Sequence, residues 1–287
     1  MRSLALTALS LAVGCSAVDR DRVAIRGSDS EVNLVQRLAE AFMLERPDVF
    51  VSVTGGGSGV GIAALIDGTC DLASSSRPLY PEERLLALRS GVEPTEHVFA
   101  RDALTFVVHA DNPVDALSLD VLGAALRGEV ERWSALGGED VPVVIYGRQA
   151  SSGTYAWLRD AVVKGDYAPT SRQMSGSSQI AEAVAHDPGG LGYVAVGYLQ
   201  AGARGIRALR VRTEGGPMSP LDHAAVDSGA YPVVRPLFQY ADGEPTGAIR
   251  DFLCFQASST GTELIHAMGF HPSPGAPRPP CPGTGAP

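Results

Sequence analysis

The stretch VPVVIYGRQASSGTYAWLRDAVV, residues 141–163, reads as a strand, a loop and a helix in succession. Residues 141–146 are apolar and rich in valine and isoleucine, which is typical of a buried strand. The loop at residues 147–154 contains several serines and glycines, and residues 155–163 are predicted to be helical. The first backbone N–H groups of a helix lack partners and lie at the positive end of its dipole. This stretch therefore predicts an anion-binding loop, to which Arg148 could add a charge-assisted contact.

Three further segments nearer the N-terminus repeat this design. They are GSDS at residues 27–30, GGGSG at residues 55–59 and SSSR at residues 74–77. Each follows a short β-like run, and helical patterns follow the first two. A serine before a helix is usually only an N-cap, worth about 1 kcal/mol. Four such segments in one chain favour a shared ligand, because a desolvated tetrahedral oxyanion needs many convergent donors.

The alternation of β-like and helical patterns continues along the chain. Helical patterns lie at residues 33–45 and 180–186, and β-like runs at residues 102–109 and 191–196. This order predicts an α/β architecture with largely parallel sheets. The 287 residues suffice for one large domain or two smaller ones.

Composition and spacing exclude several other functions. The net charge of −9 argues against nucleic-acid binding, which needs a dense lysine and arginine surface. The six histidines are spread along the chain and the cysteines fit no zinc spacing, so we expect no metal and no cofactor. The glycine-rich run at residues 55–61 matches neither the dinucleotide nor the P-loop pattern, and no G-x-S-x-G elbow is present. Without a recognisable nucleophile–base pair, an enzyme such as a phosphatase is not expected.

Both ends of the chain have compositions of their own. Arg2 and the apolar run at residues 4–13 are typical of a signal peptide, so residues 1–15 are predicted to be a signal segment. LAVGC at residues 11–15 looks like a lipobox, which predicts a lipid on Cys15 and anchoring to membrane lipid; a soluble secreted form is the alternative. Residues 272–287, rich in proline and glycine, are expected to be a disordered tail. The other cysteines, Cys70, Cys254 and Cys281, allow at most one bridge and one free thiol, and inert cysteines without chemistry are the simplest expectation.

The four segments together resemble the motifs of the periplasmic phosphate-binding proteins of ABC transporters, which are type II solute-binding proteins. GSDS, GSG, DLASSSRP and RQASSGT match in order, with supporting matches at residues 126–133, 188–193 and 231–237. The resemblance extends over residues 22–271, nearly the whole chain beyond the signal segment.

The resemblance implies a two-lobed α/β fold like that of periplasmic binding proteins. Each lobe would be a mainly parallel sheet flanked by helices, with the ligand in the cleft between lobes that close by a hinge. Residues 22–105 plus 235–271 would form lobe 1 and residues 106–234 lobe 2, with crossings near residues 102–107 and 235–240. The resemblance also implies an exported, monomeric protein of the periplasm or cell surface that captures inorganic phosphate and delivers it to ABC permease subunits.

The resemblance further implies a set of phosphate-binding groups. The hydroxyls would come from Ser30, Ser58, Ser76, Ser152 and Thr154. The backbone N–H groups would come from Glu31, Gly153 and Thr154, and a guanidinium from Arg148. Arg77 is either a second anion contact or an ordinary ion pair at the edge of a lobe.

The chain departs from the family pattern at several of these positions. Ser30 and Glu31 stand where a threonine and an apolar residue are usual. Some members carry a carboxylate in place of Ser76, which accepts the proton of hydrogen phosphate and so helps to reject sulfate. Asp29 or Asp102 could serve instead. Ala150 also replaces the aspartate that pairs with the site arginine.

Two alternatives to phosphate transport stay open on the sequence. One is another oxyanion, chiefly sulfate, molybdate or arsenate. The other is a phosphate-sensing or adhesion-type lipoprotein with the same fold.

Overall fold

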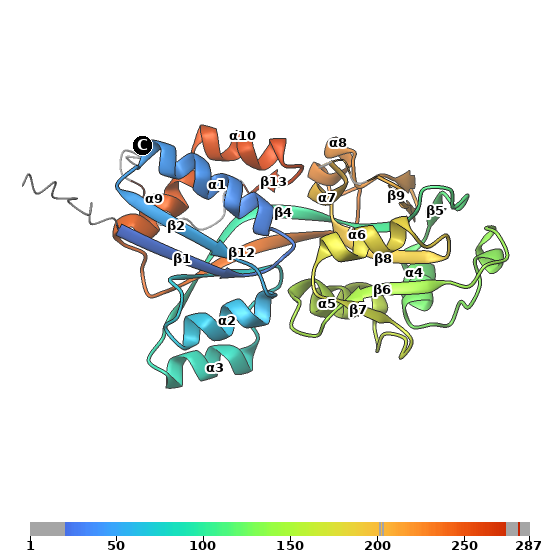
Figure 1. Cartoon of the computed structure of the whole chain (residues 1–287), viewed down its shortest axis with the longest axis horizontal. Coiled ribbons are helices and arrows are strands. Elements are labelled where there is room, and N and C mark those ends of the chain that lie inside the picture. The colour runs from blue at the N-terminus through green and yellow to red at the C-terminus, as the bar shows by residue number, and fades with distance from the viewer. Residues whose placement is uncertain (1–20, 201, 203, 274–280, 282–287) are drawn as a thin grey trace, which may run out of the picture.

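Two lobes joined by a pair of long antiparallel strands make up the structure, a computed structural model that describes residues 21–200, 202, 204–273 and 281 (Figure 1). The joining strands are β4 (Pro94–His109) and β12 (Val234–Asp242). Residues 94–103 of β4 pair with β12, whereas residues 104–108 pair with a strand of the other lobe. The chain therefore passes between the lobes along β4 and β12, close to the crossings that the sequence predicts. The predicted signal segment and the lipidation of Cys15 lie outside the described residues.

Lobe 1 is built on three parallel strands, extended by β12 and β4 in the order β2-β1-β3-β12-β4. The three are β1 (Asp21–Gly27), β2 (Val49–Thr54) and β3 (Leu72–Ser75). One face of the sheet carries α1 (Val32–Glu45), α9 (Gly247–Gln256) and α10 (Ser259–Ala267), and the other carries α2 (Ser58–Ile66) and α3 (Pro81–Arg89) (Figure 1).

Apolar side chains fill both interfaces between sheet and helices in lobe 1. On the first face Leu34, Leu38 and Phe42 of α1 pack with Phe252 of α9, and the rings of Phe42 and Phe252 meet edge to face. These α1 residues recur every four positions, so the helix predicted at residues 33–45 is confirmed.

Lobe 2 is built on a second group of parallel strands in the order β8-β6-β7. They are β6 (Val144–Arg148), β7 (Arg172–Met174) and β8 (Gly190–Ala195), and β9 (Ile206–Ala208) pairs with β4. A small separate sheet contains β5 (Ala116–Leu117), β10 (Arg210–Thr213) and β11 (Gly216–Met218).

Short helices complete lobe 2. They are α4 (Leu119–Leu126), α5 (Gly153–Leu158), α6 (Ser177–Ala185), α7 (Gly197–Gln200) and α8 (His223–Asp227), with a 3₁₀ turn at Trp133–Leu136. The helix expected at residues 155–163 begins as α5 but widens into a π-helical turn at Arg159–Val163. Trp133, Phe106 and Tyr193 lie at the centre of the lobe's main core.

The α/β, two-lobed expectation is confirmed, with one difference in strand direction. The inner strands of each lobe are parallel, but β12 is antiparallel to β3, and β4 is antiparallel to both β12 and β8. The difference arises because β4 and β12 carry the chain between the lobes in opposite directions.

The simplest expectation, inert cysteines, is met only in part, because two of the three described cysteines form a disulfide. Cys254 of α9 forms a disulfide with Cys281, while Cys70 is free and buried, which agrees with the limit of one bridge and one free thiol. The disulfide and β13 (His271–Pro272), which pairs with β4, also correct the expected disordered tail at Pro272 and Cys281. Most of the remaining tail lies outside the described residues.

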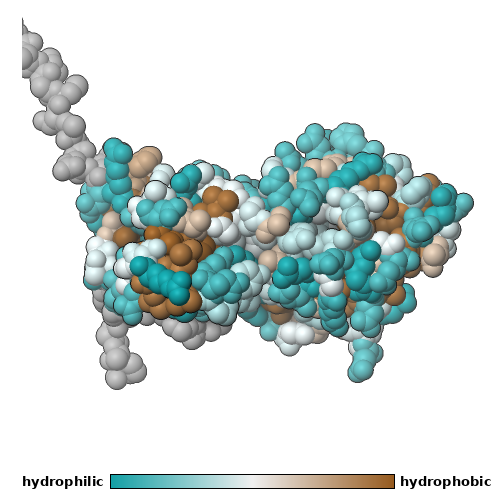
Figure 2. Space-filling view, turned by 90° about the horizontal axis from the view of Figure 1, so that it is seen from below, coloured by the Kyte–Doolittle hydropathy of each residue, from teal (hydrophilic) through white to brown (hydrophobic). Residues whose placement is uncertain are grey.

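Figure 2 shows the molecule from below relative to the view of Figure 1, and this face is largely polar. An apolar patch on lobe 1 in this view corresponds to α3, where Leu85, Leu86 and Leu88 are exposed. Among the described residues, no helix combines the length and apolar character needed to cross a bilayer.

Candidate anion-binding site

Three of the predicted loops converge at the carboxyl ends of the lobe 1 strands. Ser28 Oγ donates a hydrogen bond to Ser76 Oγ at 3.1 Å, and the backbone N–H of Ser76 donates to Ser58 Oγ at 3.1 Å. The N–H of Gly57 also donates to the carbonyl of Gly27 at 2.8 Å. Parallel strands end at the same edge of a sheet, so loops far apart in sequence are neighbours here.

The fourth loop, from lobe 2, lies directly against these three. Ser30 Oγ and Thr154 Oγ1 are 2.6 Å apart, and the N–H of Gly59 donates to the carbonyl of Ser151 at 3.0 Å. A Cβ atom built on Gly153 would lie 2.2 Å from Ser58 Oγ and 2.8 Å from Ser76 Oγ. The lobes are thus in contact at the predicted site. We call the four loops (residues 27–31, 55–59, 74–77 and 148–154) the cradle.

The cradle is lined by hydroxyls and by the starts of two long helices. Ser30, Ser58, Ser76, Ser152 and Thr154 are all buried. Glu31 is the N-cap of α1, and Gly57, with a φ of 102°, is the N-cap of α2. Ser152 caps α5 by accepting a hydrogen bond from the N–H of Tyr155 at 3.4 Å, so capping already occupies part of its hydrogen-bonding capacity.

Arg148 is buried at the end of β6, between the two lobes. Its Nη2 donates to Asp29 Oδ2 at 2.5 Å, and its backbone N–H donates to Tyr193 Oη at 3.0 Å. Nε and Nη1 have no hydrogen-bond partner among the described residues. Burial lowers the pKa of the guanidinium from its usual value, and Asp29 opposes that shift. An arginine nevertheless keeps its charge, so this one presents two unpaired donors to the cradle.

Asp29 replaces the missing partner of the arginine. Ala150 offers no carboxylate, but Asp29 reaches Arg148 from the opposite lobe, and its Oδ1 accepts a hydrogen bond from the N–H of Gly56 at 2.9 Å. Each carboxylate oxygen of Asp29 therefore already accepts one hydrogen bond. The suggestion that Asp29 could accept a ligand proton stays a prediction.

Asp102, the other suggested acceptor of a ligand proton, is part of a buried ion pair. It is completely buried at the hinge, where its Oδ2 accepts from Nε and Nη2 of Arg235 at 3.1 and 2.8 Å. Its Oδ1 accepts from the N–H of Val196 at 3.3 Å. Arg235 in turn donates from Nη1 to the carbonyl of Ser76 at 3.3 Å, which ties this ion pair to the floor of the cradle.

Arg77 was predicted to be either a second anion contact or part of an ion pair at the edge of a lobe, and it forms an ion pair. Nη1 and Nη2 bind the carboxylate of Glu83 at 2.7 and 2.6 Å, and the guanidinium lies 3.9 Å from the ring centre of Tyr80. Because both terminal nitrogens are used within lobe 1, the structure favours the edge ion pair over a second anion contact.

Glu31 is the residue whose side chain the sequence reasoning overlooked. We expected only a backbone N–H from it, yet its carboxyl group is completely buried and no charged side chain is paired with it among the described residues. Burial raises the pKa of Glu31 to about 8, and hydrogen bonding by the Ser28 hydroxyl and the charge of Arg235 oppose that shift. The available clue was an ionisable residue at a position where the resemblance expects an apolar one.

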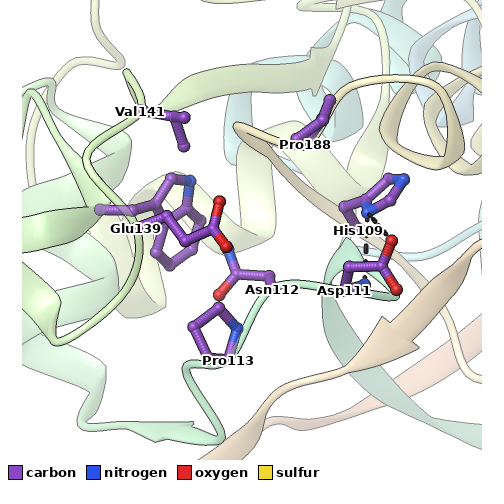
Figure 3. Close-up of a pocket in the computed structure, with 8 residues that line it drawn as sticks. His109, Asp111, Asn112, Pro113, Glu139, Val141 and Pro188 are labelled. Atoms are coloured by element: carbon purple, nitrogen blue, oxygen red, sulfur yellow. Dashed lines mark hydrogen bonds and ion pairs between the residues drawn. The ribbon is translucent and has the colours of Figure 1, made fainter.

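A small cavity lies on lobe 2 and shares no residue with the cradle (Figure 3). It has a volume of about 40 Å³, and His109, Asn112, Trp133 and Pro188 are among the residues that line it. Within the described part of the chain, no group of three histidine, cysteine or acidic side chains is arranged to hold a metal ion.

Comparison with known proteins identifies the family of this fold and site. The model of the PBP superfamily domain matches residues 16–260. The phosphate-binding protein PstS of Pseudomonas aeruginosa is 30% identical over 266 residues, which cover 86% of this chain and 82% of that protein. PstS of Bacillus subtilis is 28% identical over 255 residues, covering 86% and 79%.

A solved structure shows the same architecture. It is the phosphate-bound structure of a Clostridium perfringens protein assigned as a phosphate ABC transporter substrate-binding protein. That structure is 26% identical, has a TM-score of 0.79, and the match covers 88% of this chain and all (100%) of that one.

Proposed function

The chain belongs to the PBP superfamily, and from this membership we infer that it is the substrate-binding component of an ABC transporter for inorganic phosphate. Its relatives in Pseudomonas aeruginosa and Bacillus subtilis are named phosphate-binding proteins, and the related Clostridium perfringens structure contains phosphate.

One observation in the site carries the proposal for this chain. Arg148 is buried between the lobes with two donor nitrogens that no described residue satisfies. An unpaired buried donor is costly, so a ligand oxygen at this position would be strongly favoured. The surrounding hydroxyls and the starts of α1 and α2 supply further donors for the other oxygens of a tetrahedral anion.

The proposed contacts follow from this arrangement. Arg148 contributes the charged contact. The hydroxyls of Ser30, Ser58, Ser76 and Thr154, and the backbone N–H groups of Glu31, Gly153 and Thr154, contribute the rest. Ser152 combines ligand binding with capping of α5. Arg77 orders the edge of the cradle through Glu83.

The proposed mechanism is capture without chemistry. In an open state, with the lobes hinged apart along β4 and β12, phosphate first binds the donors of one lobe and loses its water. Closure then brings Arg148 and Thr154 of lobe 2 against Asp29 and Ser30 of lobe 1, as in the contacts described above. The closed form docks on the permease subunits, and no step makes or breaks a covalent bond.

Several accompanying features belong to the same proposal. The chain is exported and monomeric, with Cys15 as its lipid anchor, and is neither an enzyme nor dependent on a cofactor. Lobe 1 comprises residues 22–105 and 235–271, and lobe 2 comprises residues 106–234.

Calorimetric titration of the purified chain with inorganic phosphate tests the function directly. We expect one phosphate bound per chain, with small-angle scattering showing a more compact particle in the bound state. A chain that binds no phosphate between pH 6 and 9 would contradict the proposal, and tighter binding of molybdate or arsenate would replace the ligand while leaving the fold intact.

A further inference from the structure

The carboxyl group of Glu31 is buried beside the hydroxyls of the cradle. The residue lies at the start of α1, directly after Ser30, whose hydroxyl touches Thr154 of the other lobe at 2.6 Å. The Ser28 hydroxyl, which neighbours the Glu31 side chain, donates to Ser76 Oγ at 3.1 Å. Glu31 therefore adjoins the group of hydroxyls that surrounds Ser76.

The other charged groups that face Glu31 are already paired. Asp29, on the loop before α1, binds Arg148 of β6 and the N–H of Gly56. Asp102 of β4 and Arg235 of β12 bind one another, and the remaining Arg235 contact goes to the carbonyl of Ser76. Among the described residues, Glu31 is thus the buried carboxyl group that no cation pairs with, and the Ser28 hydroxyl is a hydrogen-bonding neighbour beside it.

The cradle consequently contains two kinds of unmatched group. The Nε and Nη1 atoms of Arg148 need acceptors, and the Glu31 carboxylate, when it is ionised, needs a hydrogen-bond donor. Hydrogen phosphate offers both, because it has anionic oxygens and one P–OH group. Sulfate offers only acceptors near neutral pH.

We propose, on the premise that phosphate is the ligand, that Glu31 is a specificity-determining residue of the cradle. Its carboxylate accepts the P–OH hydrogen bond of hydrogen phosphate, and the pair holds a single proton between them. Sulfate binds only when Glu31 itself carries that proton and donates it to a sulfate oxygen.

This proton count makes anion selectivity depend on pH. Burial raises the pKa of Glu31 to about 8, so in the ligand-free protein the carboxyl is mostly protonated below that pH. Above it, hydrogen phosphate still brings its own proton and binds without further uptake. Sulfate binding must take up one proton, so its affinity falls about tenfold for each pH unit.

Calorimetric titrations of phosphate and sulfate at pH 6.5, 7.5, 8.5 and 9.5 test this inference. For the wild-type chain we expect sulfate affinity to fall at least tenfold between pH 8.5 and 9.5, while phosphate affinity changes less than threefold. Repeating the pH 8.5 and 9.5 titrations in two buffers of different ionisation enthalpy should show uptake of about one proton with sulfate and none with phosphate.

Two variants separate the role of Glu31 from general effects of pH. Glu31→Gln should bind sulfate with an affinity that no longer depends on pH, because its amide always donates, and should lose affinity for phosphate at pH 9.5. Glu40→Gln is the matched control, since Glu40 lies on the same helix but is exposed and pairs with Arg37. It should retain both wild-type profiles.

The outcomes distinguish this inference from the proposed function. Wild-type phosphate binding together with a sulfate affinity that is undetectable at pH 6.5, or constant up to pH 9.5, overturns the role of Glu31 and leaves phosphate capture standing. Absence of phosphate binding at every pH overturns the proposed function itself. Should Glu31→Gln fail to fold, the wild-type pH profile and proton uptake still decide the matter.

Discussion

Arg148 of lobe 2 donates a hydrogen bond from Nη2 to Oδ2 of Asp29 in lobe 1, across 2.5 Å. The two residues are 119 positions apart in the chain. The ion pair orients the guanidinium and leaves Nε and Nη1 free to bind a ligand. Asp29 is itself held by the N–H of Gly56 and, through its carbonyl, by the hydroxyl of Tyr198 at 3.0 Å. The Arg148–Asp29 ion pair therefore forms across the two lobes and at the same time orients the charged group that faces the ligand.

Replacement of Arg148 by alanine should weaken phosphate binding by about 2 kcal/mol or more, roughly thirtyfold, because a charged hydrogen-bond donor is lost from a buried site. Calorimetry measures the change. Arg132→Ala is the control, since Arg132 lies on lobe 2 but is half exposed and pairs with Asp140. An unchanged dissociation constant for Arg148→Ala would remove this residue from the binding site.

Alanine at Gly153 should prevent full closure of the lobes. Its Cβ would lie 2.2 Å from Ser58 Oγ and 2.9 Å from Ser58 Cβ, so that Ser58 or one of the lobes must shift. We expect a loss of phosphate affinity of at least tenfold and no compaction on adding phosphate, as measured by calorimetry and small-angle scattering. The free energy of unfolding should be nearly unchanged, because Gly153 does not have a positive φ.

Gly176→Ala provides the matched control for that clash. Gly176 is also a glycine at a helix start, but a Cβ there would meet only Ser178 Oγ, at 3.8 Å. Normal compaction of the Gly153→Ala variant would show that the observed approach of the two lobes is not required for closure.

The ion pair between Asp102 and Arg235 should dominate the stability of the hinge. Both side chains are completely buried, so removing one charge leaves the other uncompensated. Asp102→Asn should lower the free energy of unfolding by roughly 3 kcal/mol, and a double variant that makes both residues apolar should recover part of that loss. Urea denaturation of the single and double variants measures the effect; a single variant within 1 kcal/mol of wild type (about the net value of an ordinary hydrogen bond) contradicts it.

Removal of the disulfide should affect stability without affecting binding. The bridge between Cys254 and Cys281 closes a loop across a sequence separation of 27 residues. Loss of such a constraint on the unfolded chain costs roughly 3.5 kcal/mol in the chain-entropy account. Serine at both positions should lower the melting temperature while the phosphate dissociation constant stays the same, because neither residue is part of the cradle. A weakened affinity would instead connect α9 to the site.

The ligand-free protein should lose stability as the pH rises from about 5 to 8. Glu31 has its pKa raised to about 8 in the folded chain, from an ordinary value of 4.5. Between these values the unfolded chain has released the proton and the folded chain retains it, so unfolding is favoured by about 1.4 kcal/mol for each pH unit. Urea denaturation across this range should show a slope that is smaller by that amount in Glu31→Gln. Equal slopes in the two chains would mean that Glu31 titrates normally.

Local patterns in the sequence predicted much of the fold. The apolar periodicity of residues 33–45 predicted α1, and the order of β-like and helical runs predicted an α/β chain. Both depend on neighbouring residues alone, since the period of side-chain burial follows from helix and strand geometry. The antiparallel direction of β4 and β12 was missed because it depends on the path of the chain between the lobes.

The cradle, like the fold, could be predicted from the sequence only in part. The Ser/Gly loops at strand ends could be found in the sequence because each is a local motif, and the spread of these motifs over the chain indicated their common ligand. The sequence by itself thus determined which donors the protein offers. Only the tertiary structure decided which of them stay unpaired, since Asp29 meets Arg148, and Asp102 meets Arg235, across more than a hundred residues of chain. It also left Glu31 buried without a charged partner, and burial, a property of the folded molecule as a whole, is what raises the pKa of that carboxyl group.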